Sequence, residues 1–436
     1  MTAAGSDKGR RVVVVGGVRT PFARAFGELA ELDTIRLGAS VVRGLLERLQ
    51  LDPRWIEEVF WGSTIFRSDA PNTGREVVLE ANLPRSVPGV TVSRACLSGL
   101  QAISSAAAAI ERGERELVIA GGSDSVSQAE VPLPRRLVRA VGQLAMGRER
   151  WSWRGLRQAL RTLGSPAALL PERPRIAERT TGLSMGQHAD DMARRAGIGR
   201  AEQDRFAMRS HQRAHAAWVA GRMAEEVVPV RLEDGTVLER DTQVRARLEP
   251  EKIASLPPVF RPGGTVTAAN ASPLSDGAAA VVLASAERAR ALGLRADVVL
   301  RGWRYDALDP FDELLLGPAL SIPRLLDAFG LGLAEVDLFE LHEAFAAQVL
   351  RVLQALGEER FARERLGRER AVGPIPDERL NVHGGSIALG HPFAATGVRL
   401  VLTAAIELRR RAARRAVVAL CAGGGMGGAA LLERMD

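Results

Sequence analysis

Apolar positions fall in two patterns along the chain: short continuous runs, and longer Ala-rich stretches with helical spacing between polar residues. This alternation of strand-like and helix-like segments is typical of α/β proteins. In the first third we expect a strand, helix, strand, helix and strand, in that order, at 11–16, 34–49, 58–62, 97–112 and 116–120.

The last third repeats this order of elements. The same five elements are expected at 297–301, 321–328, 337–341, 396–411 and 416–420. The second copy is longer, and its excess coincides with the charged stretch 357–379, which we interpret as an inserted loop. The repeat predicts two similar α/β halves packed together, with a site where strand ends and helix starts converge.

Between the halves lies a region of different composition. Residues 128–260 are rich in Arg and Pro, have amphipathic helical stretches and few strand-like runs, and predict an inserted, mostly helical loop domain. Residues 266–284 return to a strand–turn–strand pattern. We therefore expect the first half, 1–127, to be completed by 261–290, and the second half to be 291–436.

Composition limits the class of protein. The 436 residues are 46% hydrophobic, enough for a large core and two to four domains. No apolar run reaches the roughly 18 residues of a membrane span, and the short polar start has no signal-peptide pattern, so we expect a cytoplasmic protein. The two cysteines are 325 positions apart and form no CxxC motif, so any role they have is as thiols.

The positive charge is confined to one segment. The net charge is +7, but 131–175 alone has ten arginines against two glutamates, or +8, which leaves −1 for the rest. This argues against a nucleic-acid-binding protein. An amphipathic helix is expected over 148–163, suited to a membrane surface or a partner protein, and equally to packing within its own subunit or oligomer. Its apolar stripe is Trp153, Leu156, Leu160 and Leu163.

The cysteines stand in different surroundings. Cys421 precedes a glycine run that formally satisfies GxGxxG, but a strand-like segment follows instead of a helix, which excludes a dinucleotide loop. Cys96 lies where a strand gives way to an Ala-rich helix, and the helix N-terminus is expected to lower its pKa. A buried structural cysteine is the alternative. His391 precedes the matching helix of the second half, which would bring an imidazole beside the thiol.

Four blocks, in this order, together resemble the thiolase family: Val92-Ser-Arg-Ala-Cys96-Leu-Ser-Gly, His342-Glu-Ala-Phe345, Gly390-His-Pro392 and Cys421-Ala-Gly-Gly-Gly425. The resemblance runs from about Val12 to Glu433. It implies the five-layered αβαβα thiolase fold. It also implies no permanently bound cofactor and no metal, with coenzyme A and acetyl-CoA as substrates.

The resemblance implies a role for each residue. Cys96 would be the nucleophile, His391 its base, and Cys421 the acid/base at the α-carbon of acetyl-CoA. The N–H groups of Cys96 and Gly423 would form one oxyanion hole. His342 replaces an Asn that many members of the family use to hold a water molecule in the other oxyanion hole. The pantetheine channel of coenzyme A, on the inserted domain, would be lined by Met185, Ser272, Ala344 and Phe345.

The His342 form resembles the thiolase (β) subunits of the fatty acid oxidation complex. This implies a 3-ketoacyl-CoA thiolase, a homodimer or homotetramer, with a hydratase/dehydrogenase α subunit as possible partner. Alternatives are a biosynthetic acetoacetyl-CoA thiolase, a decarboxylating condensing enzyme, or a non-catalytic scaffold. His211 and His215 form an HxxxH pair without a third ligand and are interpreted, like His188, as structural; His383 has no account from the sequence.

Overall fold

The computed structural model describes residues 3–4, 10–131, 133–147, 152–164 and 177–435. The chain divides into two compact units, each described by itself below. Unit 1 comprises 1–128 and 178–436, and unit 2 comprises 129–177.

Unit 1 is built on one mixed sheet with the order β11-β12-β13-β10-β2-β9-β6-β4-β5. The strands of this order are β2 (Val12–Arg19), β4 (Val59–Gly62), β5 (Gly89–Val92), β6 (Leu117–Asp124), β9 (Ser275–Ser285), β10 (Val298–Ala307), β11 (Leu338–Leu341), β12 (Arg415–Ala422) and β13 (Met426–Arg434). Two further two-residue strands, β1 (Ala3–Ala4) and β3 (Ala23–Arg24), pair with β10 and β9.

The sheet consists of two matching halves that meet where β2 pairs with β10. In the first half, β4 is parallel to β5 and β6, and β9 is antiparallel to β6 and β2. In the second, β11 is parallel to β12, and β13 is antiparallel to β12 and β10. A parallel bridge from Phe339 to Leu380 stands where the first half has β5. The predicted duplication is confirmed.

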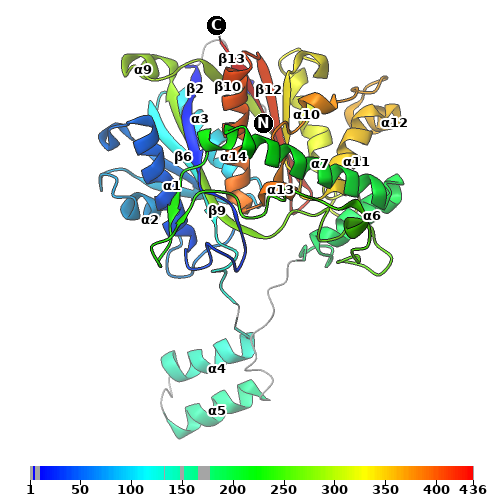
Figure 1. Ribbon diagram of the computed structural model, residues 1–436. Helices are drawn as coiled ribbons and strands as arrows, with labels where there is room; N and C mark the ends of the chain where they lie inside the picture. The colour runs from blue at the N-terminus through cyan, green and yellow to red at the C-terminus, as the bar shows by residue number, and fades with distance from the viewer. Residues whose placement is uncertain (1–2, 5–9, 132, 148–151, 165–176, 436) are drawn as a thin grey trace. The chain divides into compact units, whose positions relative to one another are not determined.

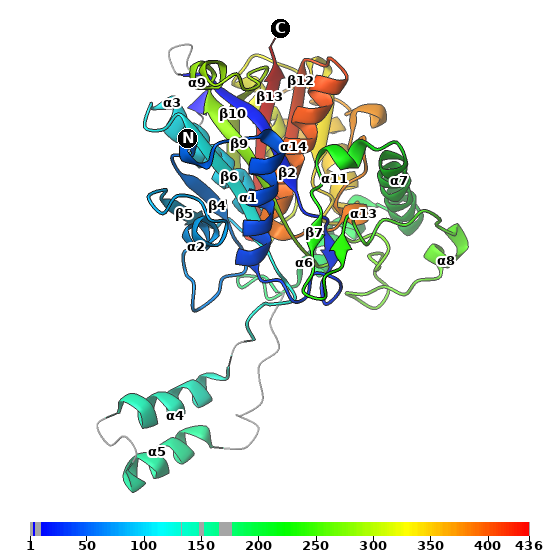
Figure 2. The same cartoon turned by 60° about the vertical axis from the view of Figure 1, so that its left-hand side comes forward.

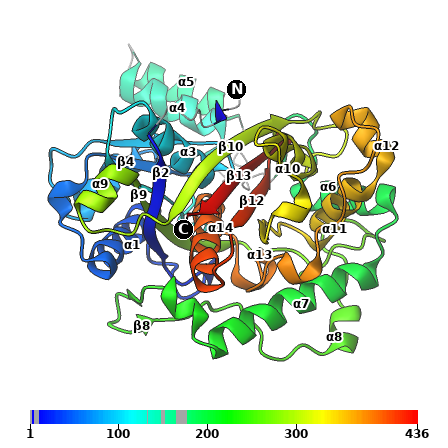
Figure 3. The ribbon, with the colours of Figure 1, turned by 90° about the horizontal axis from the view of Figure 1, so that it is seen from above.

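Side-chain alternation along the strands divides the core into layers. Val13 and Val15 of β2 pack with α1 (Thr34–Leu49), whereas Val12 and Val14 pack with α3 (Ser98–Glu111) and α14 (Phe393–Arg410). The outer face of the second half packs with α10 (Gly317–Asp327) and α11 (Ala346–Gly357). Figure 3 shows α1 on one side of the body and α10 and α11 on the other. This is the expected αβαβα arrangement.

The two central helices approach closely at their starts. A Cβ on Gly99 of α3 would overlap the carbonyl oxygen of Ala394 on α14, and a Cβ on Gly122 would lie 2.8 Å from the same oxygen. Glycine at both positions therefore permits the contact. The segments that carry Cys96 and His391 immediately precede these helix starts, so the contact holds them near one another.

One sequence prediction fails in this unit. Residues 266–284 were expected to form strand–turn–strand, but β9 begins only at Ser275. In the loop before it, the Asn270 side chain accepts from the Thr267 N–H (2.8 Å) and donates to the Thr265 carbonyl (3.1 Å). These bonds satisfy backbone groups that a strand would pair with a neighbour, which stabilises the loop instead.

Residues 178–260 belong to unit 1. They form α6 (Met185–Ala196), α7 (Arg200–Val219), α8 (Pro250–Ala254) and the hairpin β7 (Val230–Arg231) and β8 (Val237–Leu238). Helices α7 and α8 lie side by side (Figure 2). Because only 129–177 separates as a unit, the wider inserted domain of 128–260 stays a prediction.

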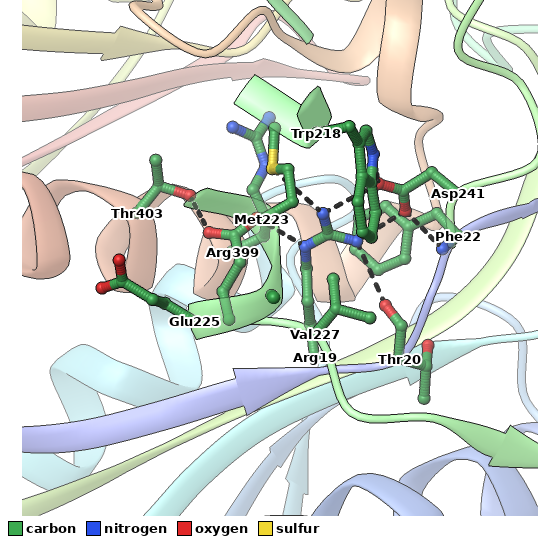
Figure 4. A network of polar contacts seen from close by, with 12 residues as sticks. Arg19, Thr20, Phe22, Trp218, Met223, Glu225, Val227, Asp241, Arg399 and Thr403 are labelled. Carbon is green, nitrogen blue, oxygen red and sulfur yellow. Dashed lines mark hydrogen bonds and ion pairs between the residues drawn. The ribbon is translucent and has the colours of Figure 1, made fainter. Parts of the chain in front are cut away.

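A buried ion-pair network connects residues 178–260 to the central sheet and to α14 (Figure 4). Arg19 at the end of β2 donates to both carboxylate oxygens of Asp241 (2.6 and 2.9 Å) and to Glu226 (2.7 Å). Glu226 in turn accepts from the Thr403 hydroxyl on α14 (2.7 Å). Arg19, Asp241 and Glu226 are all buried, so removing the Arg19 charge would leave two buried carboxylates without their ion-pair partner.

Unit 2 contains a helical hairpin of α4 (Arg135–Met146) and α5 (Trp153–Leu163), which lie side by side (Figure 1). The buried residues of the two helices are small: Ala140, Gly155 and Ala159. Trp153 is 82% exposed and Leu160 59% exposed, so the predicted apolar stripe of α5 does not pack inside the hairpin. No helix in the described ranges is both long and apolar enough to cross a bilayer.

Candidate active site

Cys96 lies in the turn between β5 and α3. The Ser98 hydroxyl holds this turn by accepting from the Arg94 N–H (2.8 Å) and donating to the Ala95 carbonyl (2.6 Å). Ala95 has a φ of 49°, a left-handed conformation that a non-glycine residue keeps only where its surroundings enforce it. The turn leaves Cys96 half-buried just outside the first helical residue.

Cys421 is the second-last residue of β12 (Arg415–Ala422) and is 1% exposed. The turn over 423–425 then reverses the chain into β13, which confirms the strand expected after the glycine run. Gly425 has a φ of 71°, and a Cβ there would lie 2.5 Å from the Leu308 carbonyl oxygen. The turn therefore requires glycine for its conformation and for close contact with neighbouring backbone.

The two thiols approach each other from opposite halves of the fold. The N–H of Gly423 lowers the pKa of the Cys96 thiol, and burial, followed by charge on Cys96, raises the pKa of Cys421. The Glu178 carboxylate accepts from the Gly424 N–H (2.7 Å) and fixes the same turn from outside. Sequence reasoning missed Glu178, which lies 246 positions from its partner.

His342 and His391 are brought together in the second half. The backbone N–H of His342 donates to the carbonyl of Ala419 (2.8 Å), so His342 directly follows β11 and lies beside β12, the strand that carries Cys421. His391 immediately precedes the start of α14. The ring centroids are 4.0 Å apart, and the ring planes are tilted by 38°.

Each imidazole is bonded to a hydroxyl through one nitrogen. Nδ1 of His342 lies 2.8 Å from Ser386 Oγ, and Nδ1 of His391 lies 2.7 Å from Thr396 Oγ1. The Nε2 atom of each ring is buried and has no hydrogen-bond partner among the described residues. These two nitrogens are therefore the groups that a substrate or its water could bind.

The buried carboxylate of Glu343 is hydrogen-bonded to the backbone next to Ser386. Glu343 accepts from the Ser210 hydroxyl (2.6 Å), the Asn381 side chain (2.7 Å) and the Ile387 N–H (3.3 Å). Burial raises the pKa of Glu343, and these donors oppose the rise. The His-Glu pair in the sequence pointed to Glu343, but nothing in the sequence pointed to Ser210 or Ser386.

Asp124 forms hydrogen bonds to both halves of the fold near the site. Its carboxylate, at the end of β6, accepts from the N–H groups of Thr64 (2.8 Å), Ile65 (2.7 Å) and Ala394 (2.9 Å). Burial raises the pKa of Asp124 to about 7, although these N–H groups lower it. Its charge also acts on Cys96. The sequence did not single out Asp124.

The expectation of a lowered Cys96 pKa is wrong. Desolvation raises the pKa of Cys96 to about 12; the Gly423 N–H opposes the rise, and the Asp124 charge adds to it. Burial also raises the pKa of Cys421. It lowers the pKa of His391 to about 3 and that of His342 well below its usual value, with Arg399 adding to both. Both histidines are therefore neutral at physiological pH.

The residues expected to line a pantetheine channel are also brought together. The Ser272 N–H donates to the Ala344 carbonyl (2.9 Å), and Phe345 contacts the Phe260 ring edge-on with centroids 5.9 Å apart. Met185, at the start of α6, packs in the same apolar cluster as Phe260 and Ala344. This cluster adjoins His342, which precedes Ala344 by two residues.

Three of the four remaining histidines have structural partners, and the fourth, His215, is half-buried on α7. His211 Nδ1 accepts from the Arg245 N–H (3.3 Å), and His188 Nε2 lies 2.8 Å from the Thr181 hydroxyl. His383, which the sequence left unexplained, lies 2.6 Å from Glu407 of α14. Within the described ranges, no group of three or more His, Cys, Asp or Glu residues could hold a metal ion.

The chain belongs to the thiolase family of acyltransferases. Residues 12–287 match the family's description "Thiolase, N-terminal domain" and residues 294–434 match "Thiolase, C-terminal domain". The two matches together cover both halves of the duplicated fold.

Relatives are similar over nearly the whole chain. A 3-ketoacyl-CoA thiolase of Erwinia tasmaniensis is 42% identical over 430 residues, 98% of this chain and 97% of that protein. One from Shewanella piezotolerans is 40% identical over 428 residues, with the same coverage.

Solved structures share the fold. Human mitochondrial 3-ketoacyl-CoA thiolase in complex with CoA has a TM-score of 0.82 and 30% identity, with 98% of each chain covered. An acetyl-CoA acetyltransferase of Bacillus anthracis has a TM-score of 0.82 and 32% identity, covering 99% of this chain and 100% of that one.

Proposed function

We propose that this thiolase-family acyltransferase is a 3-ketoacyl-CoA thiolase of fatty acid β-oxidation. It uses coenzyme A to cleave a 3-ketoacyl-CoA into acetyl-CoA and a shortened acyl-CoA. The observation that carries the proposal is the convergence of two thiols, two neutral imidazoles and the Gly423 N–H, contributed by both halves of the fold. The relatives of that name at 40–42% identity support this substrate class.

The first half-reaction transfers the acyl group to Cys96. The Cys96 thiol proton passes to Nε2 of His391 while the sulfur attacks the 3-keto carbon. The carbon–carbon bond breaks, and its electron pair goes to the α-carbon of the departing acetyl-CoA, which takes a proton from the Cys421 thiol. With pKa values of about 12 for Cys96 and about 3 for His391, the resting pair is neutral, so proton transfer accompanies attack.

The second half-reaction releases the acyl group. The Cys421 thiolate takes the thiol proton of coenzyme A, whose sulfur attacks the thioester on Cys96. The Cys96 thiolate leaves and recovers its proton from His391. Protons and electrons balance over the cycle, and both cysteines return to thiols.

Two sets of donors would stabilise the oxyanions of this cycle. The N–H groups of Cys96 and Gly423 flank the nucleophilic sulfur, where the tetrahedral oxygen develops. Nε2 of His342, which has no partner among the described residues, would donate to the thioester oxygen directly or through one water, together with His391. Such donors contribute about 10²–10³ in rate each.

A thiolysis assay tests the proposal. Wild type, Cys96→Ala and Cys421→Ala are compared on 3-ketoacyl-CoA substrates of short, medium and long chain, with acetyl-CoA release as the measurement. We expect activity in the wild type and none in either variant. Full activity in either variant would overturn the assigned roles, and activity confined to acetoacetyl-CoA would favour a biosynthetic enzyme.

We also propose that the α4–α5 hairpin docks onto an anionic membrane surface. Its support is the exposed stripe of Trp153, Leu156 and Leu160 on a helix that also carries exposed Arg157 and Arg161. Co-sedimentation with phosphatidylglycerol vesicles tests it. Trp153→Gln with Leu160→Gln should abolish binding, whereas Val219→Gln, an equally exposed apolar residue of unit 1, should not. Co-purification of a hydratase/dehydrogenase subunit without vesicle binding would favour a protein partner instead.

A further inference from the structure

Two buried hydroxyls stand behind the two active-site histidines. Ser386 and Thr396 are both fully buried, and each contacts the Nδ1 atom of one ring at hydrogen-bond distance. On the opposite side of each ring, Nε2 is buried without a partner among the described residues. Because both hydroxyls are buried, solvent does not supply an alternative partner to Nδ1. The hydroxyl alone fixes the Nδ1 side of each ring.

Each of the two imidazole rings must carry a proton on only one of its two nitrogens. They are buried 4.0 Å apart, and the guanidinium of Arg399 acts on both, so protonating either ring is unfavourable. A neutral imidazole has one N–H and one lone pair. Whether the hydroxyl donates to Nδ1 or accepts from it therefore decides whether Nε2 can take a proton or give one.

We propose that Thr396 and Ser386 are positioning residues that hold the two histidines in opposite tautomers. Thr396 Oγ1 accepts from the Nδ1–H of His391, which leaves the Nε2 lone pair free to take the proton of Cys96. The Ser386 hydroxyl donates to Nδ1 of His342, which leaves Nε2–H free to donate to the substrate oxyanion. The proposal rests on the proposed function and deepens it.

The local structure keeps each hydroxyl in place. Thr396 lies in the first turn of α14, where its β-branched side chain has few rotamers. Ser386 is the first residue of the short helix α13 (Ser386–Leu389), and the backbone on both sides of it is fixed, because the Gly385 N–H donates to Ser210 (3.0 Å) and the Ile387 N–H donates to Glu343 (3.3 Å). A fixed hydroxyl bonded to a neighbouring nitrogen is the usual means of selecting a histidine tautomer.

Alkylation of Cys96 by iodoacetamide distinguishes the roles of the Thr396 and Ser386 hydroxyls, because the reaction needs a base but no oxyanion donor. The labelled cysteine is identified by peptide mass. We expect Thr396→Val to slow alkylation about tenfold, the equivalent of one lost hydrogen bond, and Thr396→Ser to restore it. Ser386→Ala should leave alkylation within about twofold of wild type, yet lower kcat for thiolysis about tenfold with little change in KM.

Thr403→Val is the matched control, since it removes a buried hydroxyl from the same helix that is bonded to Glu226 rather than to a histidine. It should leave the alkylation rate unchanged. Equal slowing in Thr396→Val, Ser386→Ala and Thr403→Val would overturn the proposal, as would failure of Thr396→Ser to restore the rate. Wild-type protein that lacks thiolysis but shows this alkylation pattern would refute the proposed function and leave the tautomer assignment standing.

Discussion

The imidazole of His342 lies against that of His391, with ring centroids 4.0 Å apart, and both rings are neutral because they are buried. Two positive rings at this separation would repel each other strongly. The arrangement therefore divides the work: one ring can accept a proton while the other donates a hydrogen bond. Each role makes a different prediction.

Replacing His342 tests its role as a hydrogen-bond donor. His342→Ala removes the Nε2–H and should lower kcat about 100-fold, the usual effect of losing one oxyanion donor. His342→Asn keeps an N–H donor on a shorter side chain and should recover at least about tenfold of that loss. Steady-state thiolysis kinetics measure both; a His342→Ala enzyme with wild-type kcat would contradict the role.

The roles of the two cysteines should become distinguishable when acetyl-CoA is supplied as the only substrate. Acetylation of Cys96 needs no proton at the α-carbon. Cys421 only returns a proton to the departing CoA thiolate in this step, so Cys421→Ser should still form the acetyl-enzyme, more slowly, while its thiolysis turnover is lost. Cys96→Ala should form none. Intact-protein mass spectrometry measures the adduct, and loss of acetylation in Cys421→Ser as complete as in Cys96→Ala would contradict the separate roles of the two cysteines.

Gly425→Ala should damage both stability and activity. The added Cβ would meet the Leu308 carbonyl oxygen at 2.5 Å in a left-handed backbone conformation, which forces the turn next to Cys421 to move. Gly197→Ala is the control, because Gly197 has a similar φ of 69° with open space around it. The control should lose about 1 kcal/mol of unfolding free energy and keep its kcat. Equal effects would contradict the close contact.

Arg19→Met should destabilise the fold most strongly near neutral pH. Burial raises the pKa of Glu226, but Arg19 and Thr403 more than offset this and lower it below its usual 4.5. A lowered carboxylate pKa contributes stability above about pH 4.5 that is lost as pH falls through the folded-state pKa.

Without Arg19, the buried carboxylates Asp241 and Glu226 lose their partner, at a cost of about 3–5 kcal/mol. The loss should shrink as acid protonates Glu226. Urea unfolding at pH 7 and pH 4 measures this. Arg54→Met, which breaks the exposed pair with Asp52, should change neither value. A loss at pH 4 as large as at pH 7 would contradict the network's role.

The layers of the fold could be predicted because apolar periodicity is local. The helix expected over 34–49 is α1 without adjustment, and its end coincides with a left-handed Gln50. The loop before β9 was mistaken for a strand because its apolar residues suggest one, whereas the bonds of the Asn270 side chain decide its conformation. Side-chain capping of this kind leaves little trace in hydropathy.

The reactive groups of the candidate site were also predictable, since each stands within five residues of the end of an expected strand or the start of an expected helix. Their supporting residues were not. Asp124 contacts Ala394 across 270 positions, and Glu178 contacts Gly424 across 246. Such contacts depend on how the two halves pack, which a single sequence does not specify. For the same reason burial, which raises the pKa of Cys96, was underestimated.

The glycine contact between α3 and α14 affects which mutations the protein can tolerate. Gly99 and Gly122 touch no reacting atom, yet a side chain at Gly99 would push α14 away from α3, and one at Gly122 would push α14 away from β6. The distance between nucleophile and base is thus set from the interior of the molecule. In a saturation-mutagenesis screen for activity, these two buried glycines should be as intolerant of substitution as the cysteine that carries the acyl group.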